Sequence, residues 1–157
     1  MMQNTFNNTY LETGFVADAI AQVASVFPHE AFGVLRPVVR VSMGEGVNTP
    51  ARVRVYSRRA TRLPDGRLMG GSVMIAIVLP PEHEQGVYVR ADGRKVVASN
   101  AGEMLVMLTA YGLRRARQLR EGWLSGGINE WAEADADGAA ERAMRAYRLD
   151  TLRKEAA

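Results

Sequence analysis

The hydrophobic pattern of the chain changes its period near Asn100. Before that residue, apolar side chains occur in short runs or alternate with polar ones, as they do from Ala51 to Tyr56. After it, they recur every three to four residues. The first pattern is typical of strands, and the second is typical of helices that bury one face. A chain of 157 residues that contains both patterns in succession predicts a single α+β domain.

The N-terminal part of the chain predicts one helix followed by an antiparallel sheet of three to five strands. The polar residues 1–8 are expected to form a disordered or frayed tail, which leaves residues 9–157 as the domain. Thr9 and Glu12 have the spacing of a capping box in front of a helix that runs to about Val26. Strands are expected at residues 38–43, 51–56 and 72–79, and residues 87–90 and 94–97 are expected to form a hairpin around Asp92-Gly93.

Two helices are predicted after the hairpin. Asn100 has the character of an N-cap, with Glu103 three residues later, and the helix that they begin is expected to end at Gly122. After a glycine-containing turn, a last helix begins at about Asn129 and ends near Lys154. Its inward side is expected to be a stripe of small residues and one tyrosine, namely Ala132, Ala136, Ala140, Ala143 and Tyr147.

Composition argues against several classes of site. The chain has no cysteine, so a disulfide framework, a thiolate metal site and a cysteine nucleophile are all excluded. His29 and His83 each lack a second histidine at the spacing that would place two metal ligands on one helical face. Glycine-rich phosphate loops and nucleophile elbows are not found. The pattern therefore predicts no catalytic residue and no cofactor.

The apolar runs and the N-terminal residues indicate where in the cell the protein is expected. The longest apolar run, residues 73–79, has the length of a strand and is too short to cross a membrane. The first ten residues are polar and lack the charged and then apolar layout of a secretory signal. A cytoplasmic location without a membrane partner is therefore expected.

Charge is unevenly distributed along the chain. The net charge is only +3, and all of the twenty basic residues except Lys95 and Lys154 are arginine. Arg52 and Arg54 share the outward side of their predicted strand with Tyr56. In the C-terminal half, a basic block precedes an acidic one, and two opposite blocks this close are expected to face each other. These blocks are Arg114, Arg115, Arg117 and Arg120, followed by Glu130, Glu133, Asp135 and Asp137.

Two short motifs in the predicted C-terminal helices carry a family resemblance. Residues 108–118 read Leu-Thr-Ala-Tyr-Gly-Leu-Arg-Arg-Ala-Arg-Gln, and residues 133–137 read Glu-Ala-Asp-Ala-Asp. The stretch from Glu103 to Arg148 resembles the small zincin metallopeptidases of the minimal and SprT-like kind. In that family, a helix reading Leu-x-x-His-Glu-Leu-x-His-x-x-Gln is followed by a turn and a second helix with Glu-x-x-Ala-Asp. Leu113 and Gln118 match the first pattern, and residues 133–137 match the second. The resemblance implies a zincin-like fold.

The residues that would bind and use zinc in that family are replaced here. Tyr111 and Arg115 stand where the pattern has its two histidines, and Gly112 stands where it has the general-base glutamate. A catalytic zinc needs three protein ligands, and an arginine cannot lose its proton to become one. Of the three zinc ligands of the family, only Glu133 remains, and Asp137 follows it in the same motif. The resemblance therefore implies a scaffold that has lost its metal site and its peptidase activity.

The charge at position 115 leads to a specific structural prediction. Arg115 lies on the face of its helix that is otherwise apolar, where a lone charge is costly. We expect its guanidinium to pair with Glu133 or Asp137 of the last helix. The Tyr111 hydroxyl is expected to donate to the same cluster.

Two functions remain open, and an active zinc peptidase is the least favoured. The first is a non-catalytic interaction or structural protein that acts with a protein partner, with copies of itself or in an assembly. By analogy it belongs to a phage or mobile element, in the cytoplasm or in a virion. Its contact surface is expected at Arg52, Arg54, Arg58, Arg59 and Arg62. The second is a nucleic-acid-binding module that uses Arg58, Arg59, Arg62 and Arg67 together with Arg114, Arg117 and Arg120.

Overall fold

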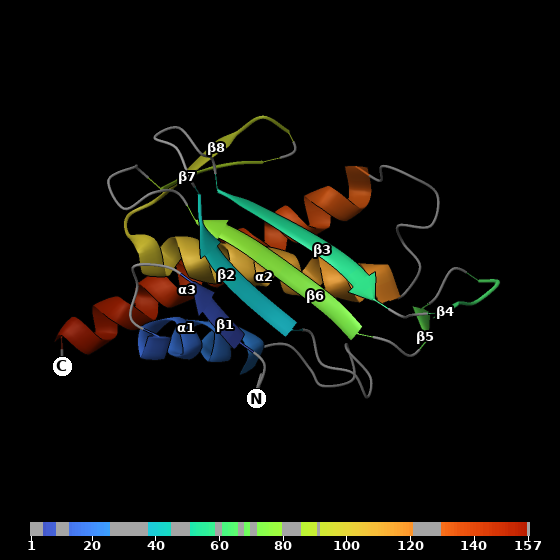
Figure 1. The fold of residues 1–157 in the computed structure, drawn as a ribbon. Coiled ribbons are helices and arrows are strands. Elements are labelled where there is room, and N and C mark those ends of the chain that lie inside the picture. The colour runs from blue at the N-terminus through green and yellow to red at the C-terminus, as the bar shows by residue number, and fades with distance from the viewer. Residues whose placement is uncertain are drawn as a thin grey trace.

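The computed structural model describes residues 5–8, 13–25, 38–44, 51–58, 61–65, 68–69, 72–79, 86–90, 92–120 and 130–156. Within these residues the α+β class is confirmed, with one helix before most of the strands and two helices after them (Figure 1). The elements in chain order are β1 (Thr5–Asn8), α1 (Thr13–Ser25), β2 (Val38–Met43), β3 (Arg52–Arg58), β4 (Thr61–Arg62), β5 (Leu68–Met69), β6 (Ser72–Leu79), β7 (Gly86–Val89), β8 (Lys95–Ala98), α2 (Ala101–Arg120) and α3 (Glu130–Ala156).

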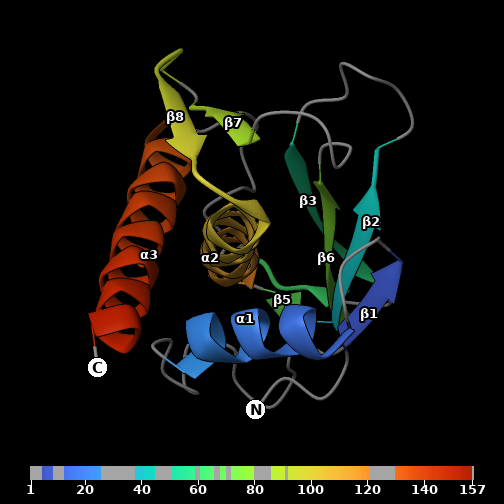
Figure 2. The same ribbon diagram turned by 90° about the vertical axis from the view of Figure 1, so that its left-hand side faces the viewer.

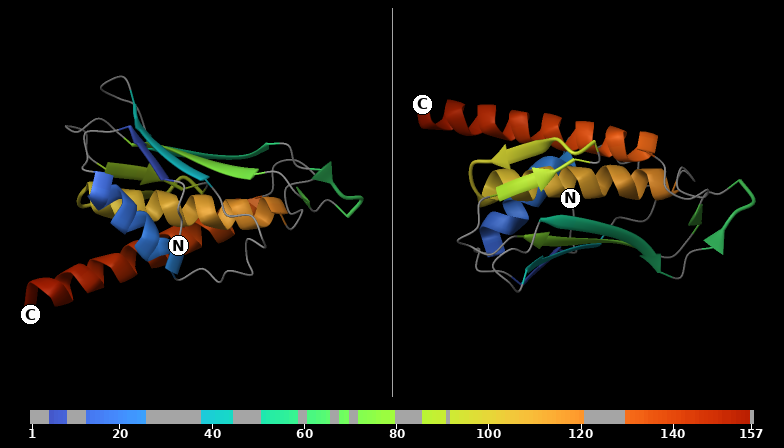
Figure 3. Two further views of the ribbon diagram at one scale, coloured as in Figure 1. Left: turned by 60° about the horizontal axis from the view of Figure 1, so that its bottom comes forward. Right: turned by 90° about the horizontal axis from the view of Figure 1, so that it is seen from above.

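The elements form three layers, which Figures 2 and 3 show from the side and from above. The first layer is a four-stranded sheet with the order β1-β2-β6-β3. Helices α1 and α2 pack on one face of this sheet, and α3 lies across α2 on the side away from the sheet. The opposite face of the sheet is the one toward the viewer in Figure 1, and none of the described helices covers it.

The sheet is mixed, which corrects the expectation of an antiparallel sheet. Strand β2 is parallel to both β1 and β6, and only β3 pairs with β6 in the antiparallel direction. Alternation of apolar and polar residues shows which side chains face the core, but it contains no information about strand direction. Parallel neighbours need a crossover connection, and α1 is the crossover element between β1 and β2.

The N-terminal strand corrects a second expectation. Residues 5–8, which the sequence suggests are part of a tail, form β1 and pair with β2 from Thr5 opposite Val39 to Asn8 opposite Ser42. A strand at the edge of a sheet is held by its backbone groups, so its side chains need not be apolar. The four-residue sequence Thr-Phe-Asn-Asn therefore lacks the alternating pattern from which strands are predicted. The expected capping box at Thr9 and Glu12 lies outside the described residues.

The hairpin after the sheet is confirmed, and it stands apart from the sheet. Strands β7 and β8 pair only with each other among the described strands. Gly93 has a φ of 85°, which a residue with a side chain adopts at a cost, and the Asp92 carboxylate accepts a hydrogen bond from the Arg94 N–H at 3.0 Å. Figure 2 shows the hairpin beside α3, at one end of α2.

Helix α2 is the centre of the core. Its apolar side chains pack against the sheet on one side and against α1 on another, and nearly all of them are fully buried. Gly112 lets the helix approach the central strand closely, because a Cβ at this position would overlap the Ile75 side chain and lie 3.2 Å from Val53 Cγ1. The buried members from α2 and the sheet include Leu105, Leu108, Leu113, Val39, Val41, Ile75 and Ile77.

The start of α2, the bounds of α3 and the packing of both helices agree with the sequence prediction, whereas the expected end of the first helix at Gly122 lies outside the described residues. The Glu103 N–H donates to Asn100 Oδ1 at 2.9 Å, so Asn100 is the N-cap of α2. The alanine stripe of α3 faces α2, with Ala132, Ala136 and Ala140 buried. No helix in the described part of the chain has an apolar stretch long enough to cross a membrane.

Candidate functional site

The positions that the zincin pattern singles out lie around the junction of α2 and α3. Tyr111 is half-buried, and burial raises the pKa of its hydroxyl. The charge of Arg115 opposes this shift, while the charges of Asp137 and Glu133 add to it. Arg115, Glu133 and Asp137 are therefore all close enough to Tyr111 to affect its hydroxyl. Gly112 faces the sheet instead, against Ile75.

The predicted ion pair of Arg115 is not formed. Arg115 Nη1 donates a weak hydrogen bond to Gln118 Oε1 at 3.4 Å, and Arg115 forms no ion pair with any residue that the structure describes. The preceding residue, Arg114, bridges the two helices instead. Successive residues leave a helix in directions about 100° apart, so a shift of one position decides which side chain reaches the neighbouring helix. Sequence spacing alone does not resolve that difference.

The bridge between α2 and α3 involves one carboxylate and two donors. Arg114 Nε and Nη2 donate to the two oxygens of Asp135 at 2.6 and 3.0 Å. Gln118, which is only 1% exposed, donates to Asp135 Oδ2 at 2.9 Å and to the carbonyl oxygen of Ala132 at 2.8 Å. The hydrogen bonds from Arg114 hold the pKa of Asp135 below its ordinary value, and those from Gln118 contribute in the same direction. This part of the expected contact between the basic and acidic blocks is present.

A second bridge joins the start of α2 to the C-terminal part of α3. Arg148 donates to Glu103 Oε1 through Nη2 at 2.5 Å and through Nε at 3.2 Å. The same oxygen accepts a hydrogen bond from the Ser99 N–H at 3.2 Å, which completes the capping of α2. Glu103 is 5% exposed, and the hydrogen bond from Arg148 lowers its pKa.

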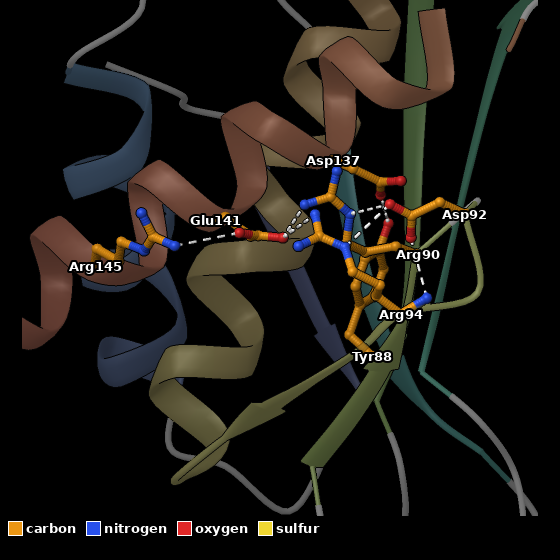
Figure 4. Close-up of polar contacts among 7 residues, drawn as sticks. All are labelled: Tyr88, Arg90, Asp92, Arg94, Asp137, Glu141 and Arg145. Carbon is orange, nitrogen blue, oxygen red and sulfur yellow. Dashed lines mark hydrogen bonds and ion pairs between the residues drawn. The ribbon is translucent and has the colours of Figure 1, made fainter. Parts of the chain in front are cut away.

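A third cluster attaches the hairpin to α3, and Figure 4 shows its seven residues. Tyr88 donates to Asp137 Oδ1 at 2.5 Å, and its ring meets that of Tyr111 edge-on with 6.0 Å between the ring centres. Burial raises the pKa of Tyr88, and the hydrogen bond to Asp137 raises it further. The hydroxyl in this cluster therefore comes from Tyr88, whereas the sequence analysis expects it from Tyr111, for which the structure describes no hydrogen bond.

The remaining members of this hairpin cluster are alternating charges. Arg90 Nη1 is bonded to Glu141, and Arg145 Nη2 lies 3.5 Å from the other oxygen of Glu141. Asp92 Oδ2 lies 3.6 Å from Arg90 Nε and 3.1 Å from Arg94 Nε. Because each cation has a carboxylate neighbour, the cluster ties the hairpin to the helix and leaves no net charge for a ligand.

The junction of α2 and α3 does not fit a catalytic zinc. Arg115 is a permanent cation, and Asp137, which is 2% exposed, already accepts a hydrogen bond from Tyr88. A glutamate at position 112 would be directed at Ile75 of the sheet. Among the described residues, no three His, Cys, Asp or Glu side chains are grouped so that they could hold a metal. His29 and His83 lie outside the described residues.

The outer face of the sheet, defined here as the side away from the helices, has a different character. Arg40, Arg52 and Arg54 are exposed on it, as predicted for Arg52 and Arg54. The Arg54 guanidinium lies 5.4 Å from the centre of the Tyr56 ring, and none of the three arginines forms an ion pair with a described residue. The strands β1, β2, β3 and β6 contain no aspartate or glutamate. Within the described strands, this face is therefore basic and carries no acidic side chain.

The other predicted contact arginines divide between the two sides of the sheet. Arg114 and Arg117 are half-buried on α2, on the helix side, so they do not share a surface with Arg52 and Arg54. The side chains of Arg58, Arg59, Arg62, Arg67 and Arg120 are not among those that the structure describes. Arg40 is a member of the face that the sequence analysis does not include. Its signal is the Val39-Arg40-Val41 alternation in β2, which places the arginine opposite two buried valines.

No family model, curated protein or solved structure matches the chain.

Proposed function

We propose that this chain is a non-catalytic interaction protein on a zincin-like scaffold, and that it binds an anionic partner through the outer face of its sheet. The observation that carries the proposal is the exposure of Arg40, Arg52 and Arg54 on a face whose strands contain no acidic residue. By analogy, an assembly of a phage or mobile element is the setting that we propose for this interaction.

The framework residues of the resemblance support the scaffold part of the proposal. Leu113 is fully buried in the core beneath the sheet, and Gln118 connects α2 to α3. The long helix against the sheet and the second helix across it have the order that the resemblance implies. At the ligand positions, Tyr111 and Arg115 replace the groups that would hold a metal. The scaffold can thus persist without its chemistry, because its framework residues serve packing.

The charges of the helix side support binding to a different molecule over binding to a second copy. The carboxylates Glu103, Asp135, Asp137 and Glu141 all accept hydrogen bonds or ion pairs within the chain. These four carboxylates are therefore engaged within the chain and are less available to the basic face of a second copy. Exposed arginines without a carboxylate neighbour attract polyanions, and their guanidinium groups form bidentate hydrogen bonds with carboxylates or phosphates.

The test measures binding of two anionic polymers, oligothymidylate and polyglutamate, by fluorescence anisotropy at about 50 mM salt. The variant R40E/R52E/R54E reverses the charge of the face. The control variant R142E/R153E/K154E makes the same change in net charge on exposed positions of α3. We expect the parent chain to bind at least one polymer, the first variant to lose at least tenfold in affinity, and the control to lose less than threefold. Failure of the parent chain to bind either polymer, or equal losses in both variants, would overturn the proposal.

A further inference from the structure

We infer that the anionic partner is a single-stranded nucleic acid, with its phosphates on Arg40, Arg52 and Arg54 and a base stacked on Tyr56. This inference rests on the proposed function, because it names the partner of the same face. It follows from the order in which side chains occur across β2, β6 and the edge strand β3.

The outer face has an apolar midline with polar and basic groups on both sides. The register places Arg40 of β2 and Arg54 of β3 on either side of Ala76, and Ser42 and Arg52 on either side of Val78. Neighbouring strands lie about 4.8 Å apart, so the backbones at Arg40 and Arg54 are about 10 Å apart, with only a methyl group between them. Guanidinium groups can therefore contact a polymer from both sides while its apolar parts lie over the midline.

Tyr56 adds an aromatic surface to this arrangement. It is half-buried at the next position along the same side of β3, and its register partners are Met74 and, beyond it, Val38. The Arg54 guanidinium is near its ring, so a planar cation and an aromatic ring lie next to each other on this face. Aromatic rings and guanidinium planes are the groups on which unpaired bases stack in proteins that bind single strands.

The width and composition of the face favour a single strand over the alternatives. Four strands span about 14 Å between their outer backbones, which exceeds the major-groove width of about 12 Å, so the sheet cannot enter the groove of a duplex. Bases in a duplex are also stacked on each other and cannot use Tyr56. An acidic polypeptide could neutralise the arginines, but it has no planar groups in regular supply for the tyrosine and the apolar midline.

The number of arginines predicts how binding depends on salt. Three phosphate contacts on a single strand give a slope of about −2 in a plot of log affinity against log salt concentration. Raising the salt from about 50 to 200 mM should then weaken binding about twentyfold. Each single substitution, Arg40→Ala, Arg52→Ala or Arg54→Ala, should reduce the magnitude of the slope by about 0.7.

The experiment compares four probes by fluorescence anisotropy, using the full chain. They are oligothymidylate and oligouridylate of about fifteen nucleotides, a duplex of the same length and polyglutamate of matched charge. We expect both single strands to bind at least tenfold more tightly than the duplex or polyglutamate. The variant Y56L should bind the single strands about tenfold more weakly and polyglutamate unchanged, whereas Y56F should bind all probes like the parent chain.

An aromatic control and a folding control complete the test. Trp131 on α3 is 83% exposed and lies on the helix side, so W131L should bind single strands like the parent chain. Urea unfolding of Y56L, Y56F and W131L confirms that each is folded under the binding conditions. Equal or tighter binding of polyglutamate, with no effect of Y56L, would overturn the inference and leave the proposed function standing. Equal binding of the duplex, or an equal loss in W131L, would also overturn it, and binding of no probe would overturn both.

Discussion

The arginines on the two sides of the sheet differ in their surroundings. On the helix side, Arg90, Arg114 and Arg148 each contact a carboxylate that is buried or half-buried on α2 or α3. On the outer face, Arg40 and Arg54 are exposed, on strands without acidic residues. A net charge of +3 conceals this difference, because Glu103, Asp135 and Glu141 on the helix side are already paired with arginines inside the fold. The same residue type connects helices in one region and is available for binding in the other.

This comparison has a direct energetic consequence. Removing one partner of a poorly hydrated ion pair leaves the other partner without a compensating charge, and the cost appears in the free energy of unfolding. Removing an exposed, unpaired arginine changes that free energy little, since water already solvates it. Substitutions on the helix side should therefore reduce stability, and substitutions on the outer face should reduce binding.

The largest loss of stability is expected for Glu103→Ala. The substitution removes the acceptor for Arg148 and for the Ser99 N–H, and so affects both the bridge between helices and the cap of α2. Arg148 is partly exposed and can turn to water, which limits the loss to about 2–3 kcal/mol. Urea unfolding followed by circular dichroism measures this loss in the free energy of unfolding.

The control is Glu133→Ala, because the structure describes no hydrogen bond or ion pair for Glu133. This substitution should cost less than about 0.5 kcal/mol. Equal losses in the two variants would contradict the role of Glu103.

A smaller loss is expected for Tyr88→Phe. The hydroxyl of Tyr88 donates to Asp137, which is almost fully buried, so its removal leaves a carboxylate oxygen without that donor. The expected cost is about 1.5–2 kcal/mol by urea unfolding. Tyr111→Phe is the matched control, because the Tyr111 hydroxyl has no described hydrogen bond, and it should cost less than about 0.5 kcal/mol. The reverse order of the two costs would mean that Tyr111, as the sequence suggests, supplies the hydroxyl of the cluster.

The elements of the fold were more predictable from the sequence than the pairing of its charges. The alternation of arginines and apolar residues at positions 52–55 identifies a strand and also the side of the strand that faces solvent. In a strand, successive side chains point to opposite faces, so the two arginines must share one face. The same reasoning would have identified Arg40. Strand direction and β1 could not be predicted in this way, since backbone hydrogen bonds to distant strands decide them. Whether Arg114 or Arg115 reaches α3 depends on how α2 is rotated about its axis relative to α3. The spacing of residues within one helix gives no information about that rotation.

Acid should weaken the helix side selectively. Hydrogen bonds from arginine lower the pKa of both Glu103 and Asp135 in the folded chain. A carboxyl with a lowered folded pKa adds stability above its unfolded pKa, about 4, and loses it as the pH falls through the folded value. The free energy of unfolding should therefore fall between pH 5 and the lower folded pKa values, by less than either substitution above. Urea unfolding at several pH values measures this, and the double variant Glu103→Gln/Asp135→Asn should show a shallower fall. An unchanged pH profile in that variant would assign the acid sensitivity to other carboxylates.

The smallest effects on stability are expected on the outer face. Arg40→Ala and Arg52→Ala should each change the free energy of unfolding by less than about 0.5 kcal/mol, since these exposed side chains have no described ion pair. Arg54→Ala should cost slightly more, about 0.5 kcal/mol, because its guanidinium lies near the Tyr56 ring.

Threonine forms strands more readily than alanine, so Arg52→Thr serves as a control for the loss of strand propensity. A loss above about 1 kcal/mol in Arg40→Ala or Arg52→Thr would mean that these arginines hold the fold together, as those on the helix side do. A small loss in stability together with a large loss in binding is the result that separates the two regions.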